Sequence, residues 1–134
     1  MPVLIKSRED GNMQIVLHNE PDYVIALRGE TSLSDLVLQH GSWIIMNAAE
    51  YSGPDLMNIA EALAATKRFD GRLRLAIRTF ESHEELKRWC PNITEGFQSP
   101  IFLFLKKGQV GKQVVGAFDQ EILFQMAKEF FEGA

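Results

Sequence analysis

The segment from Trp43 to Asp55 constrains the fold of this chain more than any other part of the sequence. Trp43 to Ala49 is an uncharged, largely apolar run of strand length, which is typical of a strand buried on both faces of a sheet. From Leu56 onward, apolar residues recur at helical spacing instead. The pattern predicts a strand, a tight turn and a helix. The buried face of this helix is expected to hold Leu56, Ile59, Ala60, Leu63 and Ala64. Its solvent face is expected to hold Asn58, Glu61, Lys67 and Arg68.

The turn between this strand and this helix has the features of a helix start. Ser52 precedes Asp55 by three residues, so the Ser52 hydroxyl can accept from the Asp55 N–H while the Asp55 carboxylate reaches back to the Ser52 N–H. A carboxylate in the first turn is also favoured by the helix dipole. Pro54 suits a first turn because that N–H has no partner within the helix.

Composition excludes several classes of protein. With 134 residues and a formal net charge of −4, the chain is expected to be one domain and not a general nucleic-acid binder. No apolar run approaches the ~20 residues that span a bilayer, and Pro2 to Ile5 is too short for the core of a signal peptide. The one cysteine, Cys90, cannot form an internal disulfide and fits a reducing compartment. We therefore expect a cytoplasmic protein without membrane contact.

The rest of the chain alternates between short strands and helices. Two apolar runs flank Asp10–Gly11 and predict a β-hairpin that extends the domain over residues 1–21, with the core at 22–134. The alternation predicts an α/β fold with a mixed sheet and helices on both faces. Further strands are expected at 23–27, 43–49, 72–78, 100–105 and 113–117, and helices at 33–40, after Ser52, at 82–89 and after Asp119. The last helix is expected to bury Ile122, Leu123, Met126, Ala127 and Phe130, and one of the adjacent Phe130 and Phe131 to face outward.

This order and several short motifs resemble the thioredoxin family. Residues 49–55, AEYSGPD, are similar to the family segment AEWCGPC, with Tyr for Trp and both cysteines replaced. The resemblance covers roughly residues 23–132. It implies a thioredoxin-like three-layer sandwich with a mixed central sheet, helices on both faces and the N-terminal β-hairpin as an extension. The other matching segments are the turn at 69–73, the cis-proline segment at 99–104 and the final hairpin at 106–110 with 115–117.

The departures from the family indicate that the redox chemistry is lost. Thiol–disulfide exchange requires an attacking thiolate and a second sulfur, and Ser52 and Asp55 supply neither. The family also keeps a buried acid and a buried lysine on two neighbouring strands, where this chain has Met46 and Ile77. The resemblance therefore implies a divergent, redox-inactive member without disulfide oxidoreductase activity, cofactor or metal.

What the resemblance retains is a surface for an extended chain. In the family, the backbone of the residue before the cis-proline pairs with a bound peptide. Carried onto this sequence, that residue is Ser99, beside Pro100. Tyr51, Gly53 and Pro54 form the apolar rim of this surface. The alternative is that Tyr51 and Pro100 serve folding alone. The predicted peptide-binding site consists of Tyr51, Ser52, Gly53, Pro54, Asp55, Ser99 and Pro100.

Three functions remain open at this stage. The favoured one is a non-catalytic adaptor or assembly chaperone that binds a protein or an extended peptide, as in the cysteine-free thioredoxin-like proteins that assist hydrogenase maturation. The second is an enzyme that uses the lone Cys90 in glutathione-linked chemistry. The third is a structural subunit that forms a homodimer through its N-terminal hairpin or an exposed terminal ring. A metal site is not expected, because His18, His40 and His83 lack the spacing of ligands.

Overall fold

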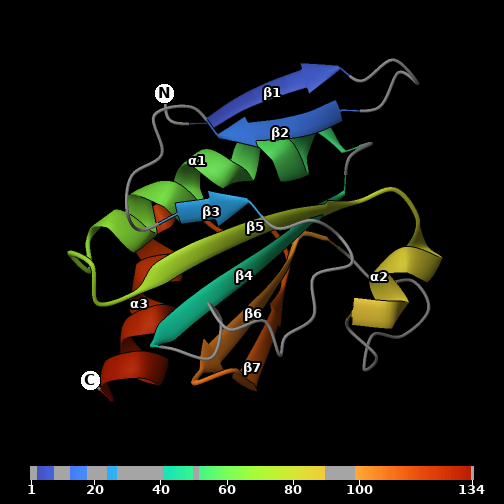
Figure 1. Ribbon diagram of the computed structural model, residues 1–134. Helices are drawn as coiled ribbons and strands as arrows, with labels where there is room; N and C mark the ends of the chain where they lie inside the picture. The colour runs from blue at the N-terminus through green and yellow to red at the C-terminus, as the bar shows by residue number, and fades with distance from the viewer. Residues whose placement is uncertain are drawn as a thin grey trace.

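The structure, a computed structural model, describes residues 3–7, 13–17, 24–26, 41–49, 52–89 and 99–133. The helix predicted at 33–40 and the candidate residues Tyr51 and Cys90 lie outside the described residues. In chain order the elements are β1 (Val3–Ser7), β2 (Met13–Leu17), β3 (Val24–Ala26), β4 (Ser42–Ala49), α1 (Gly53–Lys67), β5 (Arg74–Phe80), α2 (His83–Trp89), β6 (Ile101–Lys106), β7 (Gln109–Val115) and α3 (Gln120–Glu132) (Figure 1).

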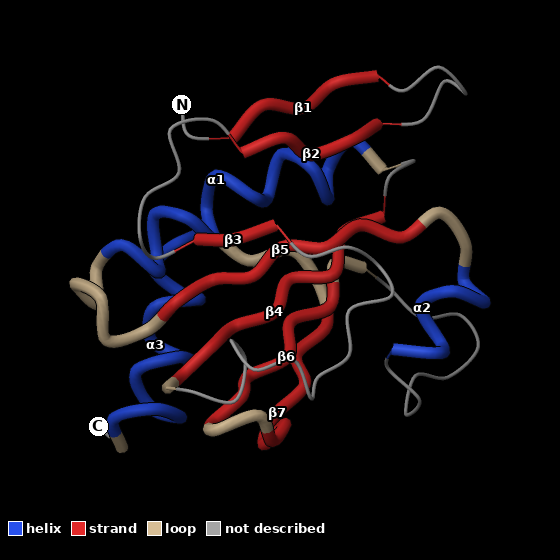
Figure 2. The backbone as a smooth tube through the Cα atoms, in the orientation of Figure 1, coloured by secondary structure: helices blue, strands red, loops and turns tan. Residues whose placement is uncertain are grey.

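The predicted mixed sheet is confirmed. It has five strands in the order β3-β5-β4-β6-β7 (Figure 2). The strands β3, β5 and β4 are parallel, whereas β6 and β7 are antiparallel. β5 ends at Phe80 rather than near residue 78, because it pairs with β4 along its whole length, from Trp43–Arg74 to Ala49–Phe80. The central strand of the sheet is therefore β4, which contains the apolar run from Trp43 to Ala49.

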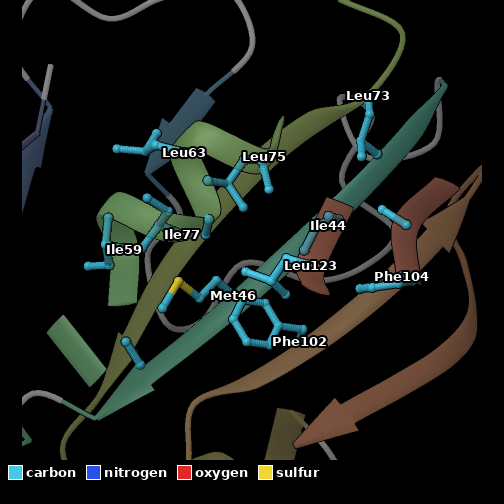
Figure 3. Packing of buried hydrophobic residues seen from close by; sticks show 14 of the residues in the cluster. Ile44, Met46, Ile59, Leu63, Leu73, Leu75, Ile77, Phe102, Phe104 and Leu123 are labelled. Carbon is cyan, nitrogen blue, oxygen red and sulfur yellow. The ribbon is translucent and has the colours of Figure 1, made fainter. Parts of the chain in front are cut away.

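Side chains of β4 alternate between two apolar layers. Met46 belongs to the layer that α1 and α3 cover, together with Phe102 and Leu123 (Figure 3). Ile45 belongs to the opposite layer, which contains Leu86 of α2. Because successive residues of a strand point to opposite faces, one uncharged strand supplies both layers. The three-layer sandwich with helices on both faces is thus confirmed.

The N-terminal hairpin forms a separate sheet. β1 and β2 pair antiparallel from Val3–Leu17 to Ser7–Met13, and β2 lies near β3 and β5 of the main sheet. The predicted β-hairpin extension is confirmed, while its proposed boundary at residue 21 stays a prediction.

The β6–β7 connection is tighter than predicted. Lys107 and Gly108 have φ angles of 51° and 80°, which is the left-handed pair of a two-residue hairpin turn. β7 therefore begins at Gln109, and the prediction of a strand that starts at residue 113 was wrong. The register shifts at Gly111, and a Cβ there would lie 2.5 Å from the ring of Phe130. This bulge breaks the strict alternation on which the sequence prediction depended.

The exposed face of α1 also differs from the prediction. Ala60 is exposed and Ala64 only half-buried, whereas Asn58, expected in solvent, is buried. The reason is that α1 also packs against α3 and the loop before it. Asn58 Nδ2 donates to the carbonyl oxygen of Phe118 at 2.8 Å, so the NH₂ end of the amide has a partner inside the fold, whereas the buried Oδ1 accepts no hydrogen bond from the described residues.

The last helix corrects two further expectations. Ile122 is 48% exposed rather than buried. Neither terminal ring faces outward alone: Phe130 and Phe131 are both half-buried, and each has its centroid 5.6 Å from that of Phe104. The planes of the Phe130 and Phe131 rings make angles of 56° and 28° with the plane of the Phe104 ring.

Candidate functional site

The turn from β4 into α1 begins the candidate site. Ser52 is the N-cap of α1, and its Oγ accepts from the Asp55 N–H at 3.3 Å. The Ser52 N–H donates to the Ala49 carbonyl, and the Ser52 carbonyl accepts from the Leu56 N–H, both at 3.1 Å. The predicted cap is confirmed, since its hydroxyl takes up a donor that the helix cannot satisfy.

The Asp55 carboxylate differs from its predicted arrangement. Because the Ser52 N–H is already used by the Ala49 carbonyl, Asp55 Oδ2 instead accepts from the Ala49 N–H at 2.8 Å. Its Oδ1 accepts from the Ser52 hydroxyl at 3.1 Å. Asp55 is only 2% exposed. The carboxylate therefore ties the first turn of α1 to the last residue of β4, and is more than a surface cap.

In the sequence resemblance, Ser52 and Asp55 take the two positions of the cysteines in the thioredoxin motif. The Ser52–Asp55 hydrogen bond holds the turn together without a covalent bond. Neither side chain contains sulfur, so this arrangement cannot carry out thiol–disulfide exchange.

Ser99 and Pro100 lie at the same end of the sheet as this turn, where β4 ends and β6 begins. We call this end of the sheet the docking edge. The Ser99–Pro100 peptide bond is cis. The β4–β6 pairing ends at Asn47–Ile101, so the two residues that precede Ile101 lie at the level of the C-terminal end of β4, where the turn into α1 starts (Figure 2). The Pro100 carbonyl accepts from the Gly116 N–H at 2.9 Å. Three chain segments, 52–55, 99–100 and 116–117, thus meet at one edge.

Exposed apolar residues lie on the segments that reach this edge. Met57 of α1 is 77% exposed and Val115 at the end of β7 is 39% exposed. Sequence reasoning missed both, although Met57 falls outside the buried series of its helix and Val115 lies in a segment already matched to the family. We define the rim as Gly53, Pro54, Met57, Val115 and Ala117, all of which are exposed.

The predicted site residues fall into two groups. Gly53 and Pro54 are exposed, and Ser52 and Ser99 are half-buried, so these residues form surface around the edge. Asp55 and Pro100 are buried and support that surface from below. For Tyr51, which lies outside the described residues, the role in binding stays a prediction.

Two neighbouring positions carry a buried polar pair that the sequence argument also missed. Met46 and Ile77 are paired, apolar and buried, as expected. The next pair, Asn47 and Arg78, lies on the opposite face and is 0% and 2% exposed. Arg78 Nε donates to Asn47 Oδ1, and Asn47 Nδ2 donates to the Ile101 carbonyl at 3.0 Å. As a polar residue in an otherwise apolar strand, Asn47 was the signal that could have revealed this pair.

Among the described residues, a pKa shift is resolved for Glu121, which belongs to α3 and lies away from this edge. A hydrogen bond from Arg68 at 2.7 Å lowers the pKa of Glu121 below its ordinary 4.5. Among the described residues, no group of three His, Cys, Asp or Glu side chains is placed to hold a metal ion. None of the described helices is long and apolar enough to cross a membrane.

Comparisons with solved structures match the chain to thioredoxins. A point mutant of thioredoxin from Halobacterium salinarum matches 83% of this chain and 93% of its own, with a TM-score of 0.64 and 17% identity. Chloroplastic thioredoxin z matches 87% of this chain and 100% of its own, with a TM-score of 0.64 and 15% identity. Thioredoxin f2 of Chlamydomonas reinhardtii matches 80% and 95%, with a TM-score of 0.62 and 16% identity. No protein-family model matches, and neither does any curated protein.

Proposed function

We propose that this chain, which has the thioredoxin fold, is a redox-inactive module that binds an extended segment of another protein. Binding would occur at the edge where Ser99 and the rim meet. The observation that carries the proposal is the combination at this edge of exposed apolar side chains with a Ser52–Asp55 hydrogen bond in place of a redox centre.

The loss of the redox centre supports a binding role over catalysis. Asp55 uses both carboxylate oxygens within the fold, one toward Ala49 and one toward Ser52. The turn is therefore stabilised by a carboxylate and a hydroxyl, neither of which takes part in thiol–disulfide exchange. An adaptor or assembly chaperone requires only the surface, and the thioredoxin fold provides that surface without cysteines.

The backbone before Pro100 supports strand-type docking. β6 begins at Ile101, and its pairing with β4 ends there, so Ser99 lies beyond the last paired residues of these two strands. Ser99 is half-buried. Strand-type recognition takes affinity from main-chain hydrogen bonds and specificity from side-chain contacts. In this proposal the Ser99 backbone makes the main-chain hydrogen bonds, and the rim makes the side-chain contacts.

The rim determines the chemistry of the partner segment. Met57 and Val115 expose apolar surface on two sides of the edge. Burying such surface contributes roughly 25 cal/mol per Å², and a methionine adapts its shape to several partners. An extended segment with apolar side chains is therefore the expected partner.

A peptide library tests this proposal. Random nine-residue peptides without cysteine are displayed on phage and selected on the wild-type protein, and the affinity of a selected peptide is then measured by fluorescence anisotropy. Ser99→Pro, which removes one main-chain donor and restricts the backbone, is expected to weaken binding roughly tenfold or more. Ser99→Ala is the matched control, because it changes the side chain and keeps the main chain.

A second pair of variants tests the rim. Val115→Ala is expected to lower the affinity for the selected peptide by a few-fold, whereas Val110→Ala should leave that affinity unchanged. The two valines are 39% and 42% exposed and lie at opposite ends of β7. Failure to select any peptide, or equal binding by Ser99→Pro and the wild type, would contradict the proposal. So would turnover in an insulin-reduction assay with thioredoxin reductase.

A further inference from the structure

Asn47 and Arg78 form a polar pair inside an otherwise apolar layer. Burying a guanidinium costs free energy unless it is well paired, and apolar residues of similar volume often stabilise a core equally well. In the layer on the other face, Met46 and Ile77 are apolar and buried. The polar pair one residue further along both strands therefore departs from the apolar filling of the positions beside it. The surrounding layer consists of Trp43, Ile45, Ala49, Ala76, Phe80, Leu86, Ile101, Leu103 and Leu105.

The hydrogen bonds of this pair run in one direction across three strands. Arg78 can only donate, and its Nε donates to Asn47 Oδ1. This fixes which end of the amide faces β5, so Asn47 Nδ2 is directed at β6, where it donates to the Ile101 carbonyl at 3.0 Å. Arg78 thus acts on the first residue of β6 through Asn47.

The pair lies at the level where β4 and β6 separate. Asn47 and Ile101 are the last paired residues of these strands. Beyond them the Ala49 N–H donates to Asp55, while the Pro100 carbonyl accepts from Gly116. The backbone that leads to Ser99 therefore has one fixed point on each side: Gly116 in the loop after β7, and Asn47 in β4.

We propose that Asn47 and Arg78 are positioning residues for the docking edge. They hold Ile101, and through it the Ser99 backbone, in the place where an incoming strand would pair. The proposal rests on the proposed function and adds to it a buried pair on the face of the sheet that Ile101 and Val115 share. In this arrangement Arg78 acts on the docking edge through Asn47.

The variant Asn47→Asp separates positioning from packing. It keeps the side-chain volume and the acceptor for Arg78 but removes the donor to Ile101. The affinity for the library-selected peptide is expected to fall roughly three- to tenfold, which corresponds to one net hydrogen bond. In the free protein, hydrogen exchange of the Gly116 amide, which is bonded to Pro100, is expected to accelerate by a similar factor.

A double variant covers the case in which Asn47→Asp does not fold. Asn47→Leu with Arg78→Leu replaces the pair by apolar side chains that the layer can accommodate, and it is expected to remain folded while showing the same weaker binding and faster Gly116 exchange. A folded variant with wild-type affinity and wild-type Gly116 exchange overturns the positioning role alone. If the wild type selects no peptide, the proposed function fails, and Gly116 exchange then decides the positioning role.

Discussion

Removal of the Asp55 carboxylate tests the account of the β4–α1 turn most directly. In Asp55→Ala, the Ala49 N–H loses its acceptor at 2.8 Å and the Ser52 hydroxyl loses its acceptor at 3.1 Å. Because Ala49 and Asp55 are 0% and 2% exposed, water cannot readily replace the carboxylate. An unsatisfied buried N–H costs about 1–3 kcal/mol, and a lost hydrogen bond adds about 0.5–1.5 kcal/mol. The expected loss of unfolding free energy is therefore about 1.5–4.5 kcal/mol.

Two companion variants divide this loss into its parts. Asp55→Asn keeps an oxygen for the Ala49 N–H and an NH₂ group that can donate to the Ser52 oxygen, so it should lose only about 1 kcal/mol, mainly the charge assistance. Ser52→Ala removes the cap and should cost about 1 kcal/mol. Equilibrium unfolding in urea, followed by far-UV circular dichroism, measures all three. An Asp55→Ala loss below about 0.5 kcal/mol, or one equal to that of Asp55→Asn, would show that the carboxylate does not hold the turn to β4.

Three further predictions concern the packing of α3 and its neighbours. Gly111→Ala places a Cβ against the Phe130 ring, 2.5 Å away, and should lower stability by about 1–3 kcal/mol in thermal unfolding; an unchanged melting temperature would show that the ring moves freely. The pKa of Glu121 is lowered by Arg68, so this pair stabilises the fold above pH 4.5 and the contribution is lost as the pH falls below that value. The stability difference between wild type and Arg68→Gln should thus shrink from pH 7 to pH 3, and a constant difference would contradict it. Ile122→Ala should change stability by less than about 0.5 kcal/mol, since the side chain is 48% exposed; a larger loss would restore its predicted place in the core.

The proposed partner segment and the buried pair are linked by a single edge of the sheet. In this proposal Ser99 provides backbone and the rim provides apolar contact, while Asn47 on the neighbouring strand donates to the Ile101 carbonyl. If the library experiment succeeds, the variants at Ser99 and Asn47 should weaken binding for different reasons: the first by removing a main-chain partner, the second by displacing it.

The sequence alone determined the elements whose cause is local. The apolar run of β4 predicted a central strand, because only a position between two layers buries every side chain of such a run. Ser52 and Ser82 predicted two helix starts, since an N-cap acts on N–H groups within its own first turn; in the structure they cap α1 and the Glu85 N–H of α2. The absence of paired cysteines predicts the loss of disulfide exchange, because that chemistry needs two sulfur atoms, and this stays a prediction.

Only the tertiary structure decided which side chains meet across strands. The Asp55 carboxylate was predicted to bond the Ser52 N–H, but the Ala49 carbonyl occupies that donor, and the strand end supplies another. Arg78 ends the strand predicted at 72–78, and only its register with Asn47 makes it a buried partner. Periodicity describes one element at a time, whereas the neighbour of a side chain depends on register and layer contacts between elements that are distant in sequence.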